Sequence, residues 1–243
     1  DYTIESDKLP KAFDNYRIVQ ISDLHDATFG DNQERLIEKV RATNPDAIFL
    51  TGDLIDSRRY DLQNSLDAVE QFVTFTDVYY VLGNHEVAVN RIDEIYEALE
   101  RLGVQILPNQ SLEIERDGER LTIIGIEDPL MGKEPQQMLD EAMATVDDKS
   151  FKILLSHRPE IFETYVENAV DVVFTGHAHG GQIRLPFSDG LFAPGQGWFP
   201  SQTSGVHEAD ETRMVVSRGL GNSVLQQRLF NLPEIVVVDL KSQ

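Results

Sequence analysis

The chain has 243 residues, 41% of them hydrophobic, which is enough to bury one sizeable core. Its 21 Lys and Arg stand against 42 Asp and Glu, a net charge of −21, which repels nucleic acid and anionic lipid unless a local positive feature overrides it. Cysteine is absent, which excludes disulfides, thiolate metal ligands and a cysteine nucleophile, and no apolar run reaches the about 18 residues that predict a membrane-spanning helix.

The N-terminal part of the chain alternates apolar runs with amphipathic stretches. The runs at 17–21, 47–50 and 78–82 predict strands, and the stretches at 32–42, 61–72 and 92–102 predict helices. A strand–helix alternation of this kind predicts parallel strands buried beneath helices.

The rest of the chain changes character. Runs at 112–115 and 121–124 around the turn Asp117-Gly118 predict a hairpin, followed by a helix at 134–146 and strands at 151–155, 170–174, 214–217 and 235–238. The segment 180–211 is rich in Gly, Pro and aromatic residues, and long irregular loops usually carry function. Because no repeat or linker divides the chain, we expect one domain, 1–243, with two sheets packed together.

Five of the six His residues lie directly after a predicted strand, and each has polar or Gly neighbours. Loops after parallel strands gather at one edge of a sheet, so these polar blocks can converge on one place. Residues two apart in an extended stretch point the same way and can reach one ion. The blocks are Asp23-Leu24-His25, Gly52-Asp53-Leu54-Ile55-Asp56, Gly83-Asn84-His85-Glu86, Ser156-His157-Arg158-Pro159 and Gly176-His177-Ala178-His179-Gly180.

Each block alone has an ordinary explanation, such as a helix cap or a tight turn. Five strand ends that each carry a His or an Asp favour a metal centre instead, and imidazole with carboxylate suits Zn, Fe or Mn. Seven residues would fill the shells of two ions if one carboxylate bridges them: Asp23, His25, Asp53, Asn84, His157, His177 and His179.

The ordered set Asp-x-His, Gly-Asp-x-x-Asp, Gly-Asn-His-Glu, a lone His and Gly-His-x-His resembles the calcineurin-like metallophosphoesterase superfamily over residues 17–184. The stretches 180–186 and 217–223, with Leu9-Pro10, resemble the bacterial branch typified by YaeI and YkuE. The resemblance implies an α/β fold of two packed mixed β-sheets flanked by helices, a four-layer sandwich, and a metal-dependent phosphoric ester hydrolase.

By position, the resemblance implies two metal sites with a shared carboxylate. One ion would be held by Asp23, His25 and His179, the other by Asn84, His157 and His177, with Asp53 as the bridge. His85 would lie beside the metals, oriented by Asp56. In relatives of the protein-phosphatase type, the residues after that Asp are Arg-Gly, whereas here they are Ser57-Arg58. This difference argues against the mode of phosphate binding found in protein phosphatases.

Two divalent ions about 3.5–4 Å apart acidify a bridging water, and the resulting hydroxide attacks phosphorus. His85 would protonate the leaving oxygen or stabilise it as imidazolium. We expect Mn, Fe or Zn, with Mg as a further option. Arg184 and Arg218 are candidates for the substrate phosphate, and a surface salt bridge is the alternative for each.

Four further polar residues near these motifs have ordinary interpretations. Asp26, Glu86 and Glu127 are interpreted as turn residues or as hydrogen-bond partners of the ligands. His207 is interpreted as a solvent-exposed bystander in a polar loop.

The substrate stays open. Members of the branch include phosphodiesterases and a pyrophosphatase acting on acylated UDP-sugars, so the resemblance implies a phosphodiester or pyrophosphate on a small-molecule, lipid-linked or nucleotide-sugar substrate. The apolar loop 186–200 is either a lid or wall for an apolar group or ordinary core.

Other functions could use the same residues. A phosphomonoesterase shares the metal block, and so does a nuclease, but a nuclease needs a basic groove that the charge of −21 disfavours. A non-catalytic scaffold or a purely structural metal site would not need every ligand together with His85 and Asp56. No nucleic-acid partner is expected, a membrane surface is a candidate partner, and the oligomeric state is open.

The chain opens at Asp1 without a Met. From this we expect a trimmed N-terminus. Relatives in the branch often carry an export signal or a membrane anchor there, so the resemblance implies a membrane-anchored or exported protein, with a cytoplasmic location as the alternative.

Overall fold

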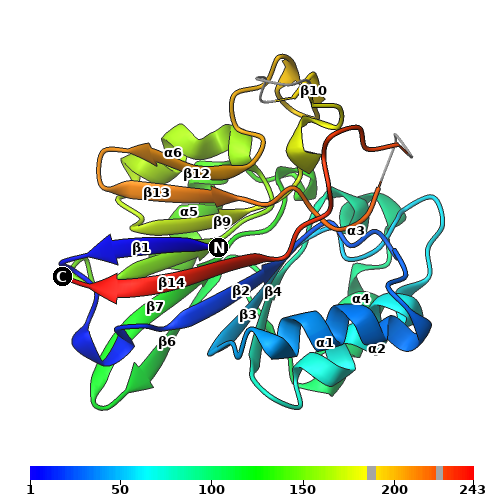
Figure 1. The fold of residues 1–243 in the computed structure, drawn as a ribbon. Helices are drawn as coiled ribbons and strands as arrows, with labels where there is room; N and C mark the ends of the chain where they lie inside the picture. Colours follow the sequence, from blue (N-terminus) through cyan, green and yellow to red (C-terminus); the bar gives the residue numbers. More distant parts are fainter. Residues whose placement is uncertain (185–189, 223–226) are drawn as a thin grey trace.

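The computed structural model describes residues 1–184, 190–222 and 227–243. Parts of the predicted segment 180–211, which includes the stretch 180–186 and the loop 186–200, and part of the stretch 217–223 therefore lie outside the described residues. The described chain forms two six-stranded sheets that pack on one another, with helices on the outer faces (Figure 1). This confirms the predicted α/β class with two packed mixed sheets flanked by helices.

The first sheet has the strand order β1-β14-β2-β3-β4-β5. Its parallel part consists of β2 (Arg17–Ile21), β3 (Ala47–Thr51), β4 (Asp77–Val81) and β5 (Gln105–Ile106). The strand β14 (Val236–Ser242) runs antiparallel to β2, and β1 (Tyr2–Ser6) pairs with β14 in parallel, so the first and last strands lie side by side at one edge of this sheet (Figure 1). Every residue of β3 is buried because both faces of this central strand are covered.

The second sheet has the strand order β12-β13-β9-β8-β7-β6. Its strands are β6 (Gln110–Arg116), β7 (Glu119–Gly125), β8 (Lys152–Leu155), β9 (Val172–Thr175), β12 (Gly205–Ala209) and β13 (Thr212–Val216). The central four run parallel, and the outer pairs are antiparallel hairpins. The predicted turn joins β6 to β7, where Asp117 and Gly118 both have positive φ, as a tight hairpin turn of this type requires.

The helices lie outside the two sheets, apart from short turns in the connections. The α-helices are α1 (Glu34–Ala42), α2 (Leu62–Phe72), α3 (Asn84–Val89), α4 (Ile92–Leu102), α5 (Pro135–Met143) and α6 (Phe162–Glu167). The 3-10 turns are η1 (Lys11–Phe13), η2 (Asp31–Gln33), η3 (Pro129–Met131), η4 (Pro159–Ile161) and η5 (His179–Gly181), and β10 (Phe192–Ala193) pairs with β11 (Gly197–Trp198). None of the helices in the described ranges has the length and apolar character needed to cross a bilayer.

A core of large apolar side chains joins the two sheets. Phe49 of β3 meets Phe174 of β9 edge to face, with ring centroids 5.1 Å apart, and Ile18 and Ile153 are fully buried in the same cluster. Truncating a buried Phe to Ala typically lowers stability by about 3–5 kcal/mol. This packing fixes the two sheets relative to one another, and hence the loops that follow their strands.

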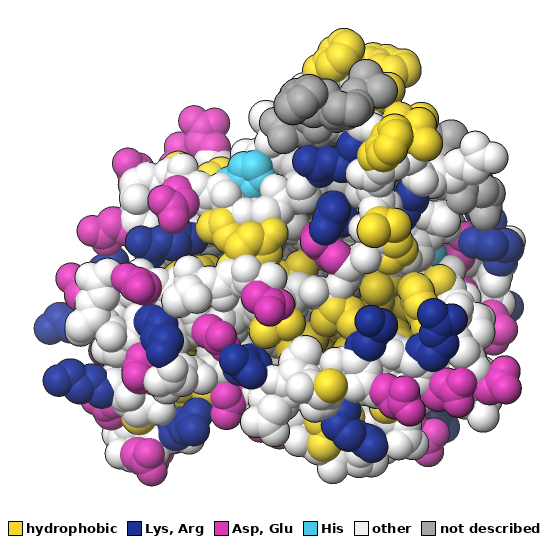
Figure 2. Space-filling model, in the orientation of Figure 1, with side chains coloured by type: hydrophobic (Ala, Val, Ile, Leu, Met, Phe, Trp, Pro, Cys, Tyr) yellow, Lys and Arg dark blue, Asp and Glu magenta, His cyan; other side chains and the backbone are white. Residues whose placement is uncertain are grey.

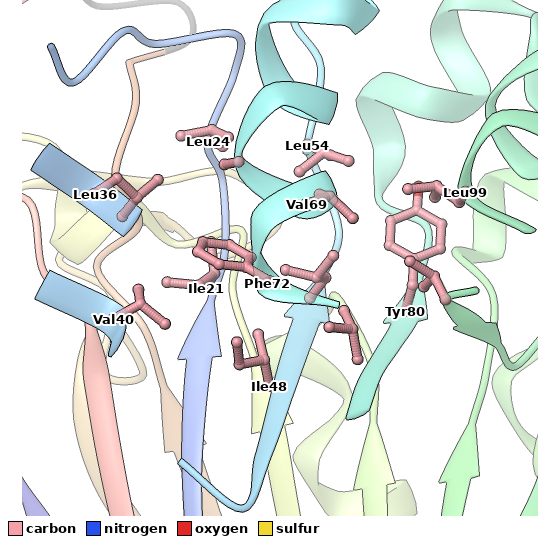
Figure 3. Packing of buried hydrophobic residues seen from close by; sticks show 14 of the residues in the cluster. Ile21, Leu24, Leu36, Val40, Ile48, Leu54, Val69, Phe72, Tyr80 and Leu99 are labelled. Atoms are coloured by element: carbon pink, nitrogen blue, oxygen red, sulfur yellow. The ribbon is translucent and has the colours of Figure 1, made fainter. Parts of the chain in front are cut away.

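A second core lies between the first sheet and its helices (Figure 3). Phe72 of α2 packs over Ile21 of β2, and Val69 of the same helix lies beside Leu54. Leu24 and Leu54, which follow β2 and β3, are buried in this cluster as well. They anchor the two loops that carry the first predicted metal ligands.

The main difference from the predicted elements lies in the segment 180–211. This segment contains β12, an edge strand with no fully buried residue, so its sequence lacks the alternation that would have predicted it. His207, expected in a polar loop, lies on β12 instead, with its Nε2 3.2 Å from the carbonyl oxygen of Ser204.

Candidate metal centre

The seven predicted ligands all lie where strands end. Asp23 and His25 follow β2, Asp53 follows β3, Asn84 begins α3 after β4, His157 follows β8, and His177 and His179 follow β9. Because the two sheets are packed together with these strand ends at one edge, loops from both sheets meet. The structure brings all seven side chains into one continuous cluster.

The first group of ligand atoms comes from Asp23, His25, Asp53 and His179, all within 4.8 Å of one another. The Nε2 atoms of His25 and His179 are 3.0 Å apart, and Asp23 Oδ1 is 3.4 Å from His179 Nε2. Asp53 Oδ2 is 3.6 Å from His25 Nε2. Imidazole nitrogens and carboxylate oxygens that converge in this way form a ligand set for a divalent cation.

The second group comes from Asp53, His157 and His177. His157 Nε2 lies 3.3 Å from Asp53 Oδ2, 3.2 Å from His177 Nδ1 and 3.1 Å from Asn84 Oδ1. Asp53 is the one residue that belongs to both groups, so its carboxylate is placed between them.

The protonation of the rings fits metal binding. Burial lowers the pKa of His25 to about 4 and that of His179 to about 3, and it also holds the pKa of His177 below its usual value. These rings are therefore neutral near pH 7, and neutral imidazole is the form that binds a metal.

His157 and Asp53 behave as a charged pair. Burial alone would lower the pKa of His157, but the combined attraction of Asp53 and the nearby Asp23 and Asp128 outweighs burial and raises it to about 10. Burial alone would raise the pKa of Asp53, but His157 and His25 hold it well below its usual value. The buried Asp53 carboxylate requires a positive charge beside it, which a proton on His157 or a divalent cation can supply.

Backbone strain is concentrated in the same place. Five of the seven candidate ligands have positive φ, namely Asp23 (51°), His25 (48°), Asp53 (52°), His177 (64°) and His179 (48°). Such non-glycine residues raise the energy by about 1–3 kcal/mol each and cluster at functional sites. The donor chemistry, the three neutral rings of His25, His177 and His179, and the strained backbone all fit a divalent metal centre.

Two glycines of the predicted blocks allow the ligands to approach. Gly52 has φ of 89°, and a Cβ built there would lie 2.7 Å from His157 Nδ1. A Cβ at Gly83 would collide with Asp53. Only glycine leaves room for these side chains at these two points.

Glu86 ties the loops after β3 and β4 together. Its buried carboxylate accepts hydrogen bonds from the backbone N–H groups of Asp53 (2.9 Å), Leu54 (2.7 Å), Ile55 (3.2 Å) and Gly83 (2.8 Å). Burial and the negative charge of Asp53 raise the pKa of Glu86 to about 7. Its role is the expected one of a hydrogen-bond partner that fixes the ligand loops.

Asp26 and Glu127 also act through hydrogen bonds. Asp26 Oδ2 accepts the backbone N–H groups of Asp56 and Asp61, at 2.9 and 3.0 Å. Glu127 lies further out, where it accepts hydrogen bonds from the side chains of Tyr96 and Asn109.

His85 lies beside the ligands, as expected. Its ring is edge-on to that of His25, with centroids 4.5 Å apart, and its backbone N–H donates to Asp53 Oδ1 at 2.8 Å. His85 Nδ1 accepts from the backbone N–H of Ser57 at 3.1 Å, and Ser57 Oγ lies 3.2 Å away. With Nδ1 as the acceptor, the neutral ring carries its proton on Nε2.

The predicted contact between Asp56 and His85 is not the one found. The Asp56 carboxylate accepts the backbone N–H of Arg58 and the Nη2 of Arg59, each at 2.8 Å, because it caps its own turn. Ser57, the next residue, takes the place at His85 Nδ1 that was expected for Asp56.

The two predicted substrate arginines lie outside the ligand cluster. Arg184 Nη1 donates to Ser204 Oγ at 2.7 Å. Arg218 forms an ion pair with Glu234 at 2.6 Å, which is the alternative that the sequence left open.

Two other arginines contact the ligand rings. Arg158 Nη1 is 2.8 Å from His177 Nε2, and Asp128 holds the Arg158 guanidinium with two hydrogen bonds. Arg228 Nη2 is 3.3 Å from His179 Nδ1. Arg158 follows a ligand directly in the sequence, which could have indicated it, whereas Arg228 lies 49 residues beyond His179 and the sequence carries no sign of this contact.

The known proteins that this chain is similar to are metallophosphoesterases. The family model described as calcineurin-like phosphoesterase matches residues 16–181. An uncharacterized metallophosphoesterase of Bacillus subtilis, YkuE, is 30% identical over 251 residues, covering 100% of this chain and 85% of that protein. An uncharacterized metallophosphoesterase of Campylobacter jejuni is 32% identical, covering 97% of this chain but only 62% of that protein.

Solved structures share the fold. The structure of TT1561 from Thermus thermophilus has a TM-score of 0.55 and 14% identity, and the match covers 84% of this chain and 89% of that one. At this identity the likeness concerns the fold alone.

Proposed function

Because the chain belongs to the calcineurin-like phosphoesterase family and is a metal-dependent phosphoric ester hydrolase, we propose that it hydrolyses a phosphodiester or a pyrophosphate with two divalent ions. Mn, Fe or Zn suit the mixture of imidazole and carboxylate ligands.

The observation that carries the two-ion proposal is the position of Asp53. Its carboxylate belongs to both groups of ligand atoms, at 3.6 Å from His25 and 3.3 Å from His157. A single ion would leave one group of buried rings and carboxylates without a cation.

When bound, the two ions would supply Lewis acidity to the phosphate and activate the attacking water. The protein supplies the proton for the leaving oxygen. The backbone N–H of Ser57 donates to His85 Nδ1, so the neutral His85 ring carries its proton on Nε2, and this ring lies against the ligand His25.

Arg228 supports a substrate with one negative charge at phosphorus. Its described hydrogen-bond acceptors, Asn222 Oδ1 and the carbonyl oxygens of Arg218 and Gly221, are neutral, so its positive charge is available beside His179. Arg158 is instead neutralised by Asp128 and Glu160. The single charge of Arg228 beside His179 suits a diester, whereas a phosphomonoester brings about −1.5 to −2 charges.

A substrate panel tests the proposal. Metal-reconstituted protein is assayed with a phosphomonoester, a phosphodiester, a nucleoside pyrophosphate carrying a lipid, and single-stranded DNA, with Asp53→Asn as the control for contaminating activity. We expect a higher kcat/KM for the diester or pyrophosphate than for the monoester, and no cleavage of DNA. Hydrolysis of the monoester alone would contradict the substrate class while leaving the metal centre intact.

A further inference from the structure

Large apolar side chains are exposed beside the metal centre, on two segments of the chain. Trp198 and Phe199 are 72% and 76% exposed, and Phe230 and Leu232 are 72% and 76% exposed. We call the whole set the apolar rim: Phe192, Trp198, Phe199, Leu229, Phe230 and Leu232. Figure 2 shows hydrophobic side chains at the upper end of the molecule, with Lys and Arg side chains just beneath them. The ordinary-core interpretation of this loop is therefore wrong for Trp198 and Phe199.

Backbone contacts join the two segments. Ile183 forms a parallel bridge with Leu229, and the N–H of Arg184 donates to the Leu229 carbonyl at 3.0 Å. Leu191 donates to Ile183 at 2.8 Å and accepts from Phe199 at 3.0 Å. The rim is therefore held as one surface.

The rim borders the metal centre on two sides. Asn231, between Phe230 and Leu232, donates to the carbonyl oxygens of His179 and Gln182 at 2.7 and 3.1 Å. On the other side, Gly195 packs so closely against Glu160 that a Cβ would collide with it, and Glu160 lies 3.9 Å from His177. Whatever covers the rim also lies next to the ligands.

The charge of the two segments differs from that of the rest of the chain. Residues 180–206 and 217–235 contain three of the 21 basic residues, Arg184, Arg218 and Arg228, and two of the 42 acidic ones, Asp189 and Glu234. The rest of the chain has 18 basic residues against 40 acidic ones. A negatively charged surface therefore repels these two segments less than it repels the rest of the chain taken together.

We propose that the apolar rim docks the protein on the surface of an anionic lipid bilayer, with the metal centre next to the lipid head groups. Trp and Phe are the side chains that partition to the membrane interface, and arginines beside them attract anionic head groups. The acidic remainder of the protein is repelled by the same surface, so the rim is the face that turns toward it. A second copy of this chain fits the rim less well, because each copy carries a net charge of −21.

Trp198 makes the docking directly measurable, because it is the single Trp of the chain and lies in the rim. Its fluorescence is recorded without substrate while vesicles of equal parts phosphatidylcholine and phosphatidylglycerol are added. We expect a blue shift of the emission, and quenching when the lipids carry bromine on their acyl chains. Because no turnover is involved, this result is independent of the proposed hydrolysis.

Two variants distinguish vesicle binding through the apolar rim from nonspecific adsorption of the protein to lipid. The double variant Phe199→Ser and Phe230→Ser retains the Trp198 reporter and should lower the partition coefficient by about tenfold or more. The control variant is Leu112→Ser. Leu112 lies on β6, at the edge of the second sheet that is farther from β12, and this variant should bind vesicles like the unaltered protein. Circular dichroism establishes that both variants are folded.

Three outcomes would overturn the proposal. The first is an unchanged Trp198 emission in the presence of anionic vesicles. The second is equal binding of pure phosphatidylcholine vesicles, which removes the role of charge. The third is a dimer in sedimentation that the double variant abolishes while vesicles leave the emission unchanged, which assigns the rim to a second copy.

Discussion

The metal centre and the apolar rim are neighbours, and each inverts the usual distribution of side chains in a protein. The centre buries carboxylates and imidazoles such as Asp23, His25 and Asp53, whereas the rim exposes Trp198 and Phe199. Buried charges and exposed large apolar groups are each unfavourable without a partner. Each region therefore needs a partner from outside the chain: divalent cations for the metal centre and, we propose, a lipid surface for the apolar rim.

The two regions also differ in how they are held. The ligands follow strands whose cores fix them, and Glu86 ties two of their loops with four backbone hydrogen bonds. The rim lies on irregular segments joined by a few backbone contacts. Substitutions in the centre should therefore have large effects on chemistry, and substitutions in the rim should have small effects on stability.

The largest effect is expected for Asp53→Asn, which keeps the side-chain volume but removes the charge shared by both ligand groups. Turnover should fall beyond the about 10⁴-fold range typical of a lost general acid, because the bridging carboxylate is gone. Steady-state kinetics with excess metal measures it. Activity within tenfold of the unaltered enzyme, in a folded variant, would show that the two groups do not work as one centre.

The next effect is expected for His85→Ala. The variant should keep its metals and lose about 10²–10⁴-fold in kcat with an alkyl leaving group, since the Nε2–H donor is removed. A nitrophenolate leaving group, which needs no proton, should lose much less. Equal losses with both leaving groups would assign His85 to holding the structure and not to proton transfer.

A smaller effect on kcat/KM is expected for Arg228, and it distinguishes this residue from Arg218. Arg228→Gln removes the cation beside His179 and should lower kcat/KM by about 10–100-fold, the range for a lost charged hydrogen bond. Arg218→Gln, its matched control, removes an ion pair with Glu234 and should change kcat/KM by about twofold or less. The reverse order of effects would instead support Arg218 as the phosphate contact, which the sequence left open as an alternative to a salt bridge.

The smallest effect is expected in the rim. Phe230→Ser should change the free energy of unfolding by about 0.5 kcal/mol or less, because the side chain is exposed. By contrast, Phe49→Ala in the core between the sheets should cost about 3–5 kcal/mol. Urea denaturation measures the free energy of unfolding of both variants. A decrease above about 2 kcal/mol for Phe230→Ser, as large as that of a core substitution, would show that the rim is packed in solution.

Much of this contrast could be predicted from the sequence. Long apolar runs predicted β2, β3 and β4, because central parallel strands are apolar on both faces, and all seven candidate ligands follow strands that were predicted. The edge strand β12 was missed because its half-exposed residues carry no clear alternation, whereas in β1 the alternation of Tyr2 and Ile4 with Thr3 and Glu5 is too short to stand out.

The contacts around the ligands were harder to predict, because they depend on side-chain direction and not on spacing. Asp56 has the expected motif spacing, yet its carboxylate turns back to Arg58, and Ser57 meets His85 instead. Arg228 reaches His179 only through the folded path of the last loop. The exposure of Trp198 was open for the same reason, since a loop rich in aromatic residues is equally consistent with a covered and an uncovered position.

Anomalous diffraction from crystals of the Mn-loaded protein tests the central claim most directly, because it locates each ion independently of activity. We expect two peaks about 3.5–4 Å apart, one among Asp23, His25 and His179 and the other among Asn84, His157 and His177, with Asp53 contacting both. A single peak, or two peaks that Asp53 does not share, would contradict a binuclear centre at these strand ends.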